Sequence, residues 1–241
     1  MNLVFTSAGD NTRFNTLWVS SEQTYDIVVY YYGDSDENYE KYKAISKLCL
    51  RRKGSKFQNF YQFYTSYPDI IVHYDLFFIL DDDIIISVGD INNMFRIANK
   101  YNLAICQPSF KKGSIVSHGI TRHKPQIFLQ YTNFVEVNTP LFSRAALDKA
   151  MTKYSPNLIG WGIDFLYIWA NGFSETAYAV IHGVQCINPR AQEKGGRREL
   201  YLIPLHSTRR VVWEAYADSI GCPKSFPIRC YKYIKIADSN K

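Results

Sequence analysis

Three adjacent carboxylates, Asp81, Asp82 and Asp83, directly follow the apolar stretch 74–80. Like charges at this spacing repel one another, and a divalent cation would relieve the repulsion because Mg²⁺ and Mn²⁺ prefer carboxylate oxygens. Residues i and i+2 of an extended chain point the same way, so Asp81 and Asp83 could share one metal ion while Asp82 faces away or caps the next turn. A loop that only caps the following helix is the alternative. The apolar strand before the triplet favours the metal site.

A tryptophan between two glycines, Trp161 with Gly160 and Gly162, is the second chemical signal. Glycines let a ligand approach the backbone closely, and an indole face stacks well on the apolar side of a sugar ring. Asp164 follows at the start of a helix-like segment. It could cap that helix or, beside a ligand, act as the general base that deprotonates an incoming hydroxyl. Residue type alone leaves both roles open.

His182, in the strand-like stretch 179–183, is the third candidate. A lone histidine on a strand is more often a hydrogen-bonded core residue than a ligand. Beside a metal site, however, its neutral imidazole would be a further metal ligand. His206 is the rival for that role, and His118 and His123, in a polar loop, are weaker candidates.

The first half of the chain alternates strand-like and helix-like stretches, which would position these groups. Hydrophobic patterns predict strands at 3–5, 26–32, 74–80 and 103–105, and helices at 36–48, 57–64 and 88–98. Such alternation predicts an α/β fold with a parallel sheet and right-handed crossovers. Ligands of such sheets bind outside the carboxyl ends of the strands, where the acidic triplet falls.

The second half is less regular. We expect strands at 134–137 and 178–184, and helices at 144–153, 164–170 and 209–217. Beyond Gly221 the chain is basic and interrupted by prolines. We therefore predict one domain over residues 1–221, followed by a basic tail or linker over residues 222–241. This linker could lead to a further domain of a longer, multidomain polypeptide.

Composition excludes several classes of protein. The 241 residues carry a formal net charge of +6, and 46% are hydrophobic, which excludes a disordered or collagen-like chain. The basic clusters 51–53, 197–198 and 209–210 are short and dispersed. A duplex-binding protein concentrates such charge on one face, so we predict no nucleic-acid partner. One or two of these clusters would suffice to attract an anionic small molecule such as a diphosphate.

Cysteine usage and hydropathy indicate the compartment. The five cysteines include no CxxC pair, which argues against a disulfide scaffold and fits a reducing compartment. The first residues lack the charged and apolar regions of a signal peptide. The apolar run 76–80 is far too short to span a bilayer. These features predict a cytoplasmic protein without a membrane span, in the host cytoplasm if the chain is viral.

Four segments resemble, in the same order, those of GT-A glycosyltransferases: FILDDD at 78–83, TPLFSR at 139–144, GWGIDF at 160–165 and VIHG at 180–183. The likeness is to a plant and algal-virus family of unknown function, including the N-terminal domain of a chlorovirus glycosyltransferase that builds capsid-protein glycans. It covers about residues 1–210. The resemblance implies a single Rossmann-like GT-A domain with a mainly parallel sheet. It also implies a UDP-sugar donor, Mn²⁺ or Mg²⁺ on its diphosphate, and a glycan acceptor.

The resemblance also implies roles for particular residues. Asp81 and Asp83 resemble the D-x-D metal pair, and His182 the late metal-binding histidine. Asp164 matches the carboxylate that activates the acceptor. Donor contacts would come from Lys56, in a Gly-x-Lys-aromatic segment, and from the stretch after the first strand, namely Ser7, Gly9, Asp10 and Asn11.

One position departs from the family. Plant members have Trp-Asp-Glu-Asp where this chain has Leu-Asp-Asp-Asp at 80–83. The metal pair survives this change, but the role of the tryptophan is lost.

Together these features predict a metal-dependent transfer of sugar from a UDP-sugar, UDP-L-rhamnose or UDP-glucose, to a glycan hydroxyl, with inversion, in glycoprotein glycan synthesis. A phosphohydrolase of the haloacid dehalogenase type is one alternative. Such enzymes place their acidic pair after the first strand and follow it with a small hydroxylated residue, whereas 84–86 here is Ile-Ile-Ile. A non-catalytic nucleotide- or carbohydrate-binding module is the other alternative.

Overall fold

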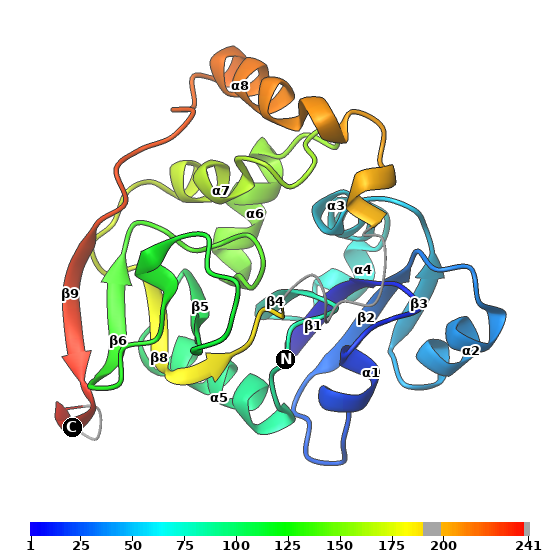
Figure 1. Ribbon diagram of the computed structural model, residues 1–241, viewed down its shortest axis with the longest axis horizontal. Coiled ribbons are helices and arrows are strands. Elements are labelled where there is room, and N and C mark those ends of the chain that lie inside the picture. Colours follow the sequence, from blue (N-terminus) through cyan, green and yellow to red (C-terminus); the bar gives the residue numbers. More distant parts are fainter. Residues whose placement is uncertain (190–198, 239–241) are drawn as a thin grey trace.

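Strands from both halves of the chain meet in one sheet at the centre of the molecule (Figure 1). The computed structural model describes residues 1–189 and 199–238. The strands in these ranges are β1 (Asn2–Ala8), β2 (Asp26–Tyr31), β3 (Leu48–Arg51), β4 (Leu76–Asp81), β5 (Ile105–Phe110), β6 (Ile127–Thr132), β7 (Leu141–Ser143), β8 (Tyr178–Cys186) and β9 (Cys230–Lys235). Their order across the sheet is β3-β2-β1-β4-β7-β5-β8-β6-β9.

The two halves of the sheet differ in strand direction. β3, β2, β1 and β4 run parallel to one another, as do β5 and β8. β7 is antiparallel to β4 and β5, and β6 is antiparallel to β8 and β9. The sheet is therefore mixed, and the expectation of a mainly parallel sheet holds only for its first half. Parallel neighbours need long crossovers, usually helical, and no α-helix separates β5, β6 and β7 along the chain.

Helices cover both faces of the sheet. They are α1 (Phe14–Leu17), α2 (Asp36–Ala44), α3 (Lys56–Ser66), α4 (Pro68–Ile71), α5 (Val88–Lys100), α6 (Arg144–Lys153), α7 (Ile163–Asn171) and α8 (Arg209–Ile220). Short 3₁₀ turns are η1 (Gly119–Thr121), η3 (Glu199–Leu202), η4 (His206–Thr208) and η5 (Ile236–Asp238). Side chains of α1, α2 and α5 pack in one core, and those of α3, α4, α6, α7 and α8 pack in another. The architecture has three layers, with the sheet in the middle.

Serine residues begin four of these helices. Ser35, Ser55, Ser87 and Ser143 each accept a hydrogen bond from a backbone N–H of the first turn of α2, α3, α5 and α6, respectively. At α3 the Gln58 side chain also returns to the backbone of Ser55, which completes a capping box. This box fixes the start of α3.

β4 is buried on both faces, which explains its continuous apolar sequence. Phe78 and Leu80 lie in the core with α5, whereas Phe77 and Ile79 lie in the core with α3 and α6. Because side chains alternate along a strand, each face receives one set. Only at Asp81, the last residue of β4, does the strand reach a polar environment.

The remaining element predictions were of mixed accuracy. A strand expected at 134–137 is wrong: this stretch is irregular, and the backbone N–H of Glu136 donates to the Gln107 side chain. The strand expected at 103–105 instead begins at Ile105 and runs to Phe110. β3, β6, β7 and β9 were not predicted.

The predicted tail contains part of the sheet. β9 lies within residues 222–241 and pairs along its length with β6, so this part of the tail belongs to the sheet. Residues 239–241 of the tail, and Arg197 and Arg198 of the second basic cluster, lie outside the described residues. In the described ranges, no helix has both the length and the apolar character needed to cross a membrane.

Candidate active site

A pocket of about 590 Å³ lies at the carboxyl ends of β1 and β4. Ser7 of β1 and Asp81 of β4 are register partners, so the two strand ends open side by side. The loop after β1, the loop before α3 and the acidic triplet line the pocket. Residues 137–138 and 159–161, together with Leu200, Leu202 and Arg209, also line it. This is the edge of the sheet at which a ligand was predicted.

The end of β1 and the loop after it form one wall of the pocket through Ser7, Gly9, Asp10 and Asn11. The carboxylate of Asp10 accepts hydrogen bonds from the Tyr31 hydroxyl and from Asn38 Nδ2, the latter at 2.9 Å. Burial acts to raise the pKa of Asp10, but these hydrogen bonds outweigh it and lower the pKa. Asp10 is therefore an ionised group that anchors this wall to β2 and α2.

Lys56, the first residue of α3, holds the end of β4 in place. Its Nζ lies 2.9 Å from Asp81 Oδ1 and donates to the carbonyl oxygens of Ile79, Val137 and Asn138 at 3.2, 2.8 and 2.9 Å. Burial lowers the pKa of Lys56, and the charge of Asp81 opposes that shift. Lys56 lines the pocket, as expected for a donor contact, but its ammonium group already bonds to four oxygen atoms of the protein.

Asp82 faces the loop after β1, contrary to the expectation that it would face away or cap the next turn. Its Oδ2 accepts from the backbone N–H of Gly9 at 2.9 Å and from the Tyr32 hydroxyl at 3.4 Å. Burial raises the pKa of Asp82 to about 7, and the neighbouring charge of Asp83 adds to the shift. The middle carboxylate thus joins the ends of β1 and β4.

The triplet provides a donor set suited to a hard divalent cation. One lysine stands against three carboxylates, so the cluster keeps an excess of negative charge. In the described parts of the chain, no three His, Cys, Asp or Glu side chains are grouped to hold a metal ion. Mg²⁺ is commonly held by only one or two carboxylates, with water and substrate phosphates completing its shell. Asp81 and Asp83 fit that requirement, although Oδ1 of Asp81 is engaged by Lys56.

The predicted general base, Asp164, lies in the first turn of α7 and is 8% exposed. Its Oδ1 accepts from the backbone N–H of the next residue, Phe165, at 3.1 Å. The N-cap of α7 is Gly162, without a side-chain cap hydrogen bond, so Asp164 does not cap the helix. Burial raises its pKa to about 7. Asp164 is not among the residues that line the pocket, although Trp161, three residues earlier, is.

Glu136 is a buried carboxylate that the sequence analysis missed. It is 2% exposed and accepts hydrogen bonds from Thr121 Oγ1 at 3.3 Å and from Asn138 Nδ2 at 3.2 Å. Asn138 lines the pocket, so this hydrogen bond connects Glu136 to the pocket wall. Burial raises its pKa to about 7, and the charges of Asp164 and Asp81 act in the same direction. The only sequence signal was a single acidic residue inside an apolar stretch.

Trp161 and Arg209, the first residue of α8, form another part of the pocket wall. The indole is 43% exposed, and the guanidinium carbon of Arg209 lies 5.6 Å from its ring centre. Gly160 lines the pocket beside Trp161, whereas Gly162 does not and instead packs against Trp213. The glycines therefore differ in role, and Gly162 serves packing rather than close approach of a ligand.

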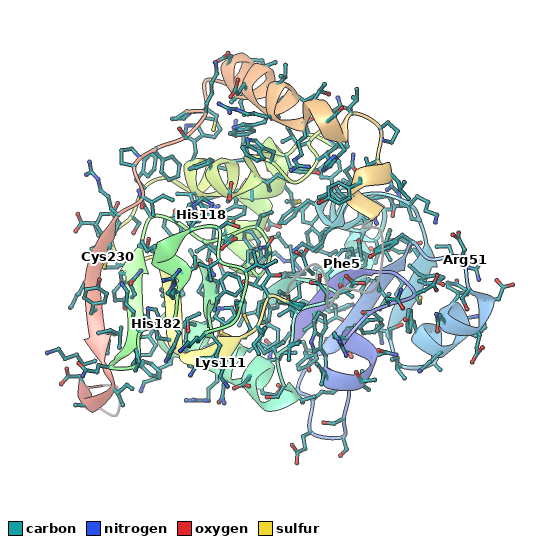
Figure 2. All side chains as sticks on the ribbon, viewed as in Figure 1. Phe5, Arg51, Lys111, His118, His182 and Cys230 are labelled. Carbon is teal, nitrogen blue, oxygen red and sulfur yellow. The ribbon has the colours of Figure 1, made fainter. Side chains whose placement is uncertain are left out.

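The structure does not bring His182 to the acidic triplet. His182 lies in β8, on the β6 side of the sheet (Figure 2), is 2% exposed and does not line the pocket. Its Nδ1 accepts from the backbone N–H of Lys124 at 3.2 Å, and burial lowers its pKa to about 3. His206, His118 and His123 are also absent from the described pocket wall. The core alternative for His182 fits these observations better than the metal-ligand role.

Comparisons with known proteins concern mainly the fold. The sequence model of a protein family of unknown function, DUF707, matches residues 11–130. No curated protein matches the sequence. Among solved structures, the crystal structure of S. aureus TarS aligns with a TM-score of 0.54 at 11% identity, over 91% of this chain and 39% of the TarS chain.

Crystal structures of residues 1–349 of S. aureus TarS give the same result. The complex with UDP-GlcNAc aligns with a TM-score of 0.55 at 11% identity, over 91% of this chain and 66% of that one. A second crystal structure of TarS 1–349 aligns with a TM-score of 0.54 at 12% identity, over 91% of this chain and 65% of that one. This chain thus spans about two fifths of the full TarS chain. Such low identity concerns architecture alone: the chain shares the mixed α/β fold of these TarS structures.

Proposed function

We propose that this chain is a GT-A glycosyltransferase that moves a sugar from a UDP-linked donor to a hydroxyl of a glycan acceptor. One observation carries the proposal: the loop after β1, the acidic triplet and Trp161 converge on a single pocket of about 590 Å³. That volume lies within the about 300–1,000 Å³ typical of small-molecule sites. The likeness to a fold that was crystallised with UDP-GlcNAc supports a nucleotide-sugar donor.

The donor would extend across the pocket between its two walls. The nucleoside would lie against Ser7, Gly9, Asp10 and Asn11, and the sugar against Trp161, whose exposed indole face offers an apolar surface. Asp81 and Asp83 would hold Mn²⁺ or Mg²⁺, which as a Lewis acid would stabilise negative charge on the diphosphate. UDP-L-rhamnose and UDP-glucose remain the donor candidates, in the synthesis of glycoprotein glycans.

Asp164 would accept the proton of the attacking hydroxyl. A carboxylate with a pKa near 7 is well matched to proton transfer at neutral pH, and such a base typically contributes about 10²–10⁴-fold. Contacts of a base with its substrate often tighten only when the substrate is bound, so a position behind the pocket wall is compatible with this role. Attack opposite the leaving diphosphate would invert the anomeric centre.

The first experiment is thermal unfolding with UDP-, GDP- and dTDP-sugars, in Mn²⁺ or EDTA. A ligand that binds only the folded state at about 100 times its Kd adds about 2.7 kcal/mol of stability. We expect stabilisation by the UDP class, dependent on Mn²⁺. Absence of a shift with every nucleotide sugar would contradict the proposal and favour the phosphohydrolase. Binding without turnover would favour the binding module.

Asp164→Asn should keep donor binding and abolish transfer, measured as release of UDP in the presence of hydroxyl acceptors. In the wild type, transfer should rise with pH through about 7 and level off above it, because the base must be ionised. Glu136→Gln is the matched variant, since Glu136 is also buried and has a similarly raised pKa. Full transfer by Asp164→Asn, with loss in Glu136→Gln, would move the base to Glu136.

A further inference from the structure

Arg209 places a guanidinium in the pocket wall, and no carboxylate of residues 1–189 and 199–238 forms an ion pair with it. It lines the pocket, and its Nη1 atom is buried without a hydrogen-bond partner in the part of the chain that the structure describes. A buried donor without a partner costs free energy, more so on a charged group. A ligand atom that accepts a hydrogen bond from this Nη1 group would therefore stabilise the arrangement.

The other cations of the pocket are already paired. Within the described residues, Lys53 and Lys56 also line it, but Lys53 Nζ lies 3.0 Å from Asp34 and Lys56 Nζ lies 2.9 Å from Asp81. No carboxylate of these residues forms an ion pair with Arg209. The neighbouring Arg210 differs as well, since it is exposed and bonds to Glu214 at 2.8 Å. Arg209 is thus set apart from the lysines and from its own neighbour.

The indole of Trp161 helps to orient the guanidinium of Arg209. The guanidinium carbon lies 5.6 Å from the centre of that ring, which is within the range of a cation–π contact. A stacked guanidinium keeps its N–H groups directed outward in the plane of the group. Such a planar fork matches the oxygens of a phosphate and binds them with two hydrogen bonds.

From this geometry we propose that Arg209 binds the diphosphate of a nucleoside diphosphate, and that Trp161 positions its guanidinium for that contact. The inference rests on the proposed function and extends it: the diphosphate is held from two walls, by Arg209 on one side and from the side of the acidic triplet on the other. The three carboxylates alone would repel a diphosphate. Arg209 supplies the positive charge that this pocket needs in the absence of a cation from solution.

The test is calorimetric titration of UDP and of uridine into the wild type, Arg209→Gln, Arg209→Lys and Arg210→Gln, in Mn²⁺. Hydrogen bonds to charged groups predict that Arg209→Gln weakens UDP binding by about tenfold or more. Uridine, which has no phosphate, should bind the wild type and Arg209→Gln equally. Arg209→Lys should bind UDP with intermediate affinity, because an ammonium group cannot form the planar fork.

The control is Arg210→Gln, which removes the same charge one residue away and should bind UDP as the wild type does. Equal UDP affinity for Arg209→Gln and Arg210→Gln would overturn the role of Arg209 while leaving the proposed function in place. An equal loss for UDP and uridine in Arg209→Gln would also overturn it. A wild type that binds no nucleotide would overturn the proposed function as well. Thermal unfolding of each variant without ligand verifies that it is folded.

Discussion

Lys56 is a buried cation whose contacts serve the fold. Its ammonium group joins the start of α3 to the end of β4 and to the irregular segment 137–138. The family likeness suggested a donor contact for this residue. The structure adds a second role for Lys56. Its partners are oxygen atoms of the protein, and these would lose their hydrogen-bond donor if the side chain were removed.

Lys56→Met should therefore destabilise the protein strongly. The Lys56 and Asp81 side chains are 10% and 27% exposed. Removing one partner of a fully buried ion pair costs about 3–5 kcal/mol, because the other charge is left uncompensated, and this figure is the upper limit for the partly exposed pair here. Lys53→Met is the matched control, since its ion pair with Asp34 is exposed and should contribute at most about 1 kcal/mol. Denaturant unfolding measures both. If Lys56→Met were as stable as Lys53→Met, yet lost UDP binding, the main role of Lys56 would be ligand binding.

At the scale of residues, the sequence could predict the acidic triplet but not the partners of each carboxylate. The position of 81–83 after a buried strand could be predicted because the apolar run 76–80 directly precedes it. The contact of Asp82 with Gly9 crosses 73 residues of sequence, and no local pattern reports it. Glu136 was missed for the same reason, since its neighbours Thr121 and Asp164 come from other segments.

At the scale of elements, the two glycines that flank Trp161 offer a sharp comparison. Both have positive φ, +69° at Gly160 and +77° at Gly162. A Cβ at Gly160 would meet nothing within 4 Å, whereas a Cβ at Gly162 would lie 2.1 Å from the indole of Trp213 in α8. Gly162 is also the N-cap of α7, so the packing of α7 and α8 depends on its lack of a side chain.

Gly160→Ala should cost about 1–2 kcal/mol, the strain of a left-handed backbone. Gly162→Ala carries the same strain and adds about 1–3 kcal/mol of overpacking, because the indole must move. The midpoint of denaturant unfolding for the two variants tests this difference. Equal midpoints would mean that Trp213 adjusts freely, and that α8 is not held by this contact.

Strong local patterns predicted elements well, and weak ones did not. β1, β2, β4 and β8 were predicted because continuous apolar runs mark strands buried on both faces. β7 has only three residues, and β9 is mostly exposed, so neither carries a pattern that separates it from a loop. Apolar and polar residues alternate in the stretch 134–137 as in a strand. In the structure, however, the backbone N–H of Glu136 donates to the side chain of Gln107 in β5.

At the scale of the molecule, the extent of the domain is the main difference from the sequence prediction. A basic, proline-containing segment was expected to lie outside the domain. Contacts of residues 222–238 hold this segment to the domain instead: β9 pairs with β6, Phe226 packs edge-on against Phe165 at 5.0 Å, and Trp213 Nε1 donates to the Lys224 carbonyl at 3.0 Å. Pairing with a distant strand leaves little trace in composition, which explains the difference.

Deletion of residues 222–241 should therefore destabilise the whole protein. Without β9, β6 would become an edge strand with unpaired backbone groups, and exposed edges promote association between chains. We expect a lower unfolding midpoint and concentration-dependent aggregation, measured by denaturant unfolding and light scattering. The control is deletion of 239–241, which leaves β9 and all three contacts in place. A chain of residues 1–221 that unfolded at the wild-type midpoint and stayed monomeric would mean that the domain is complete at Gly221, with β9 as an accessory strand.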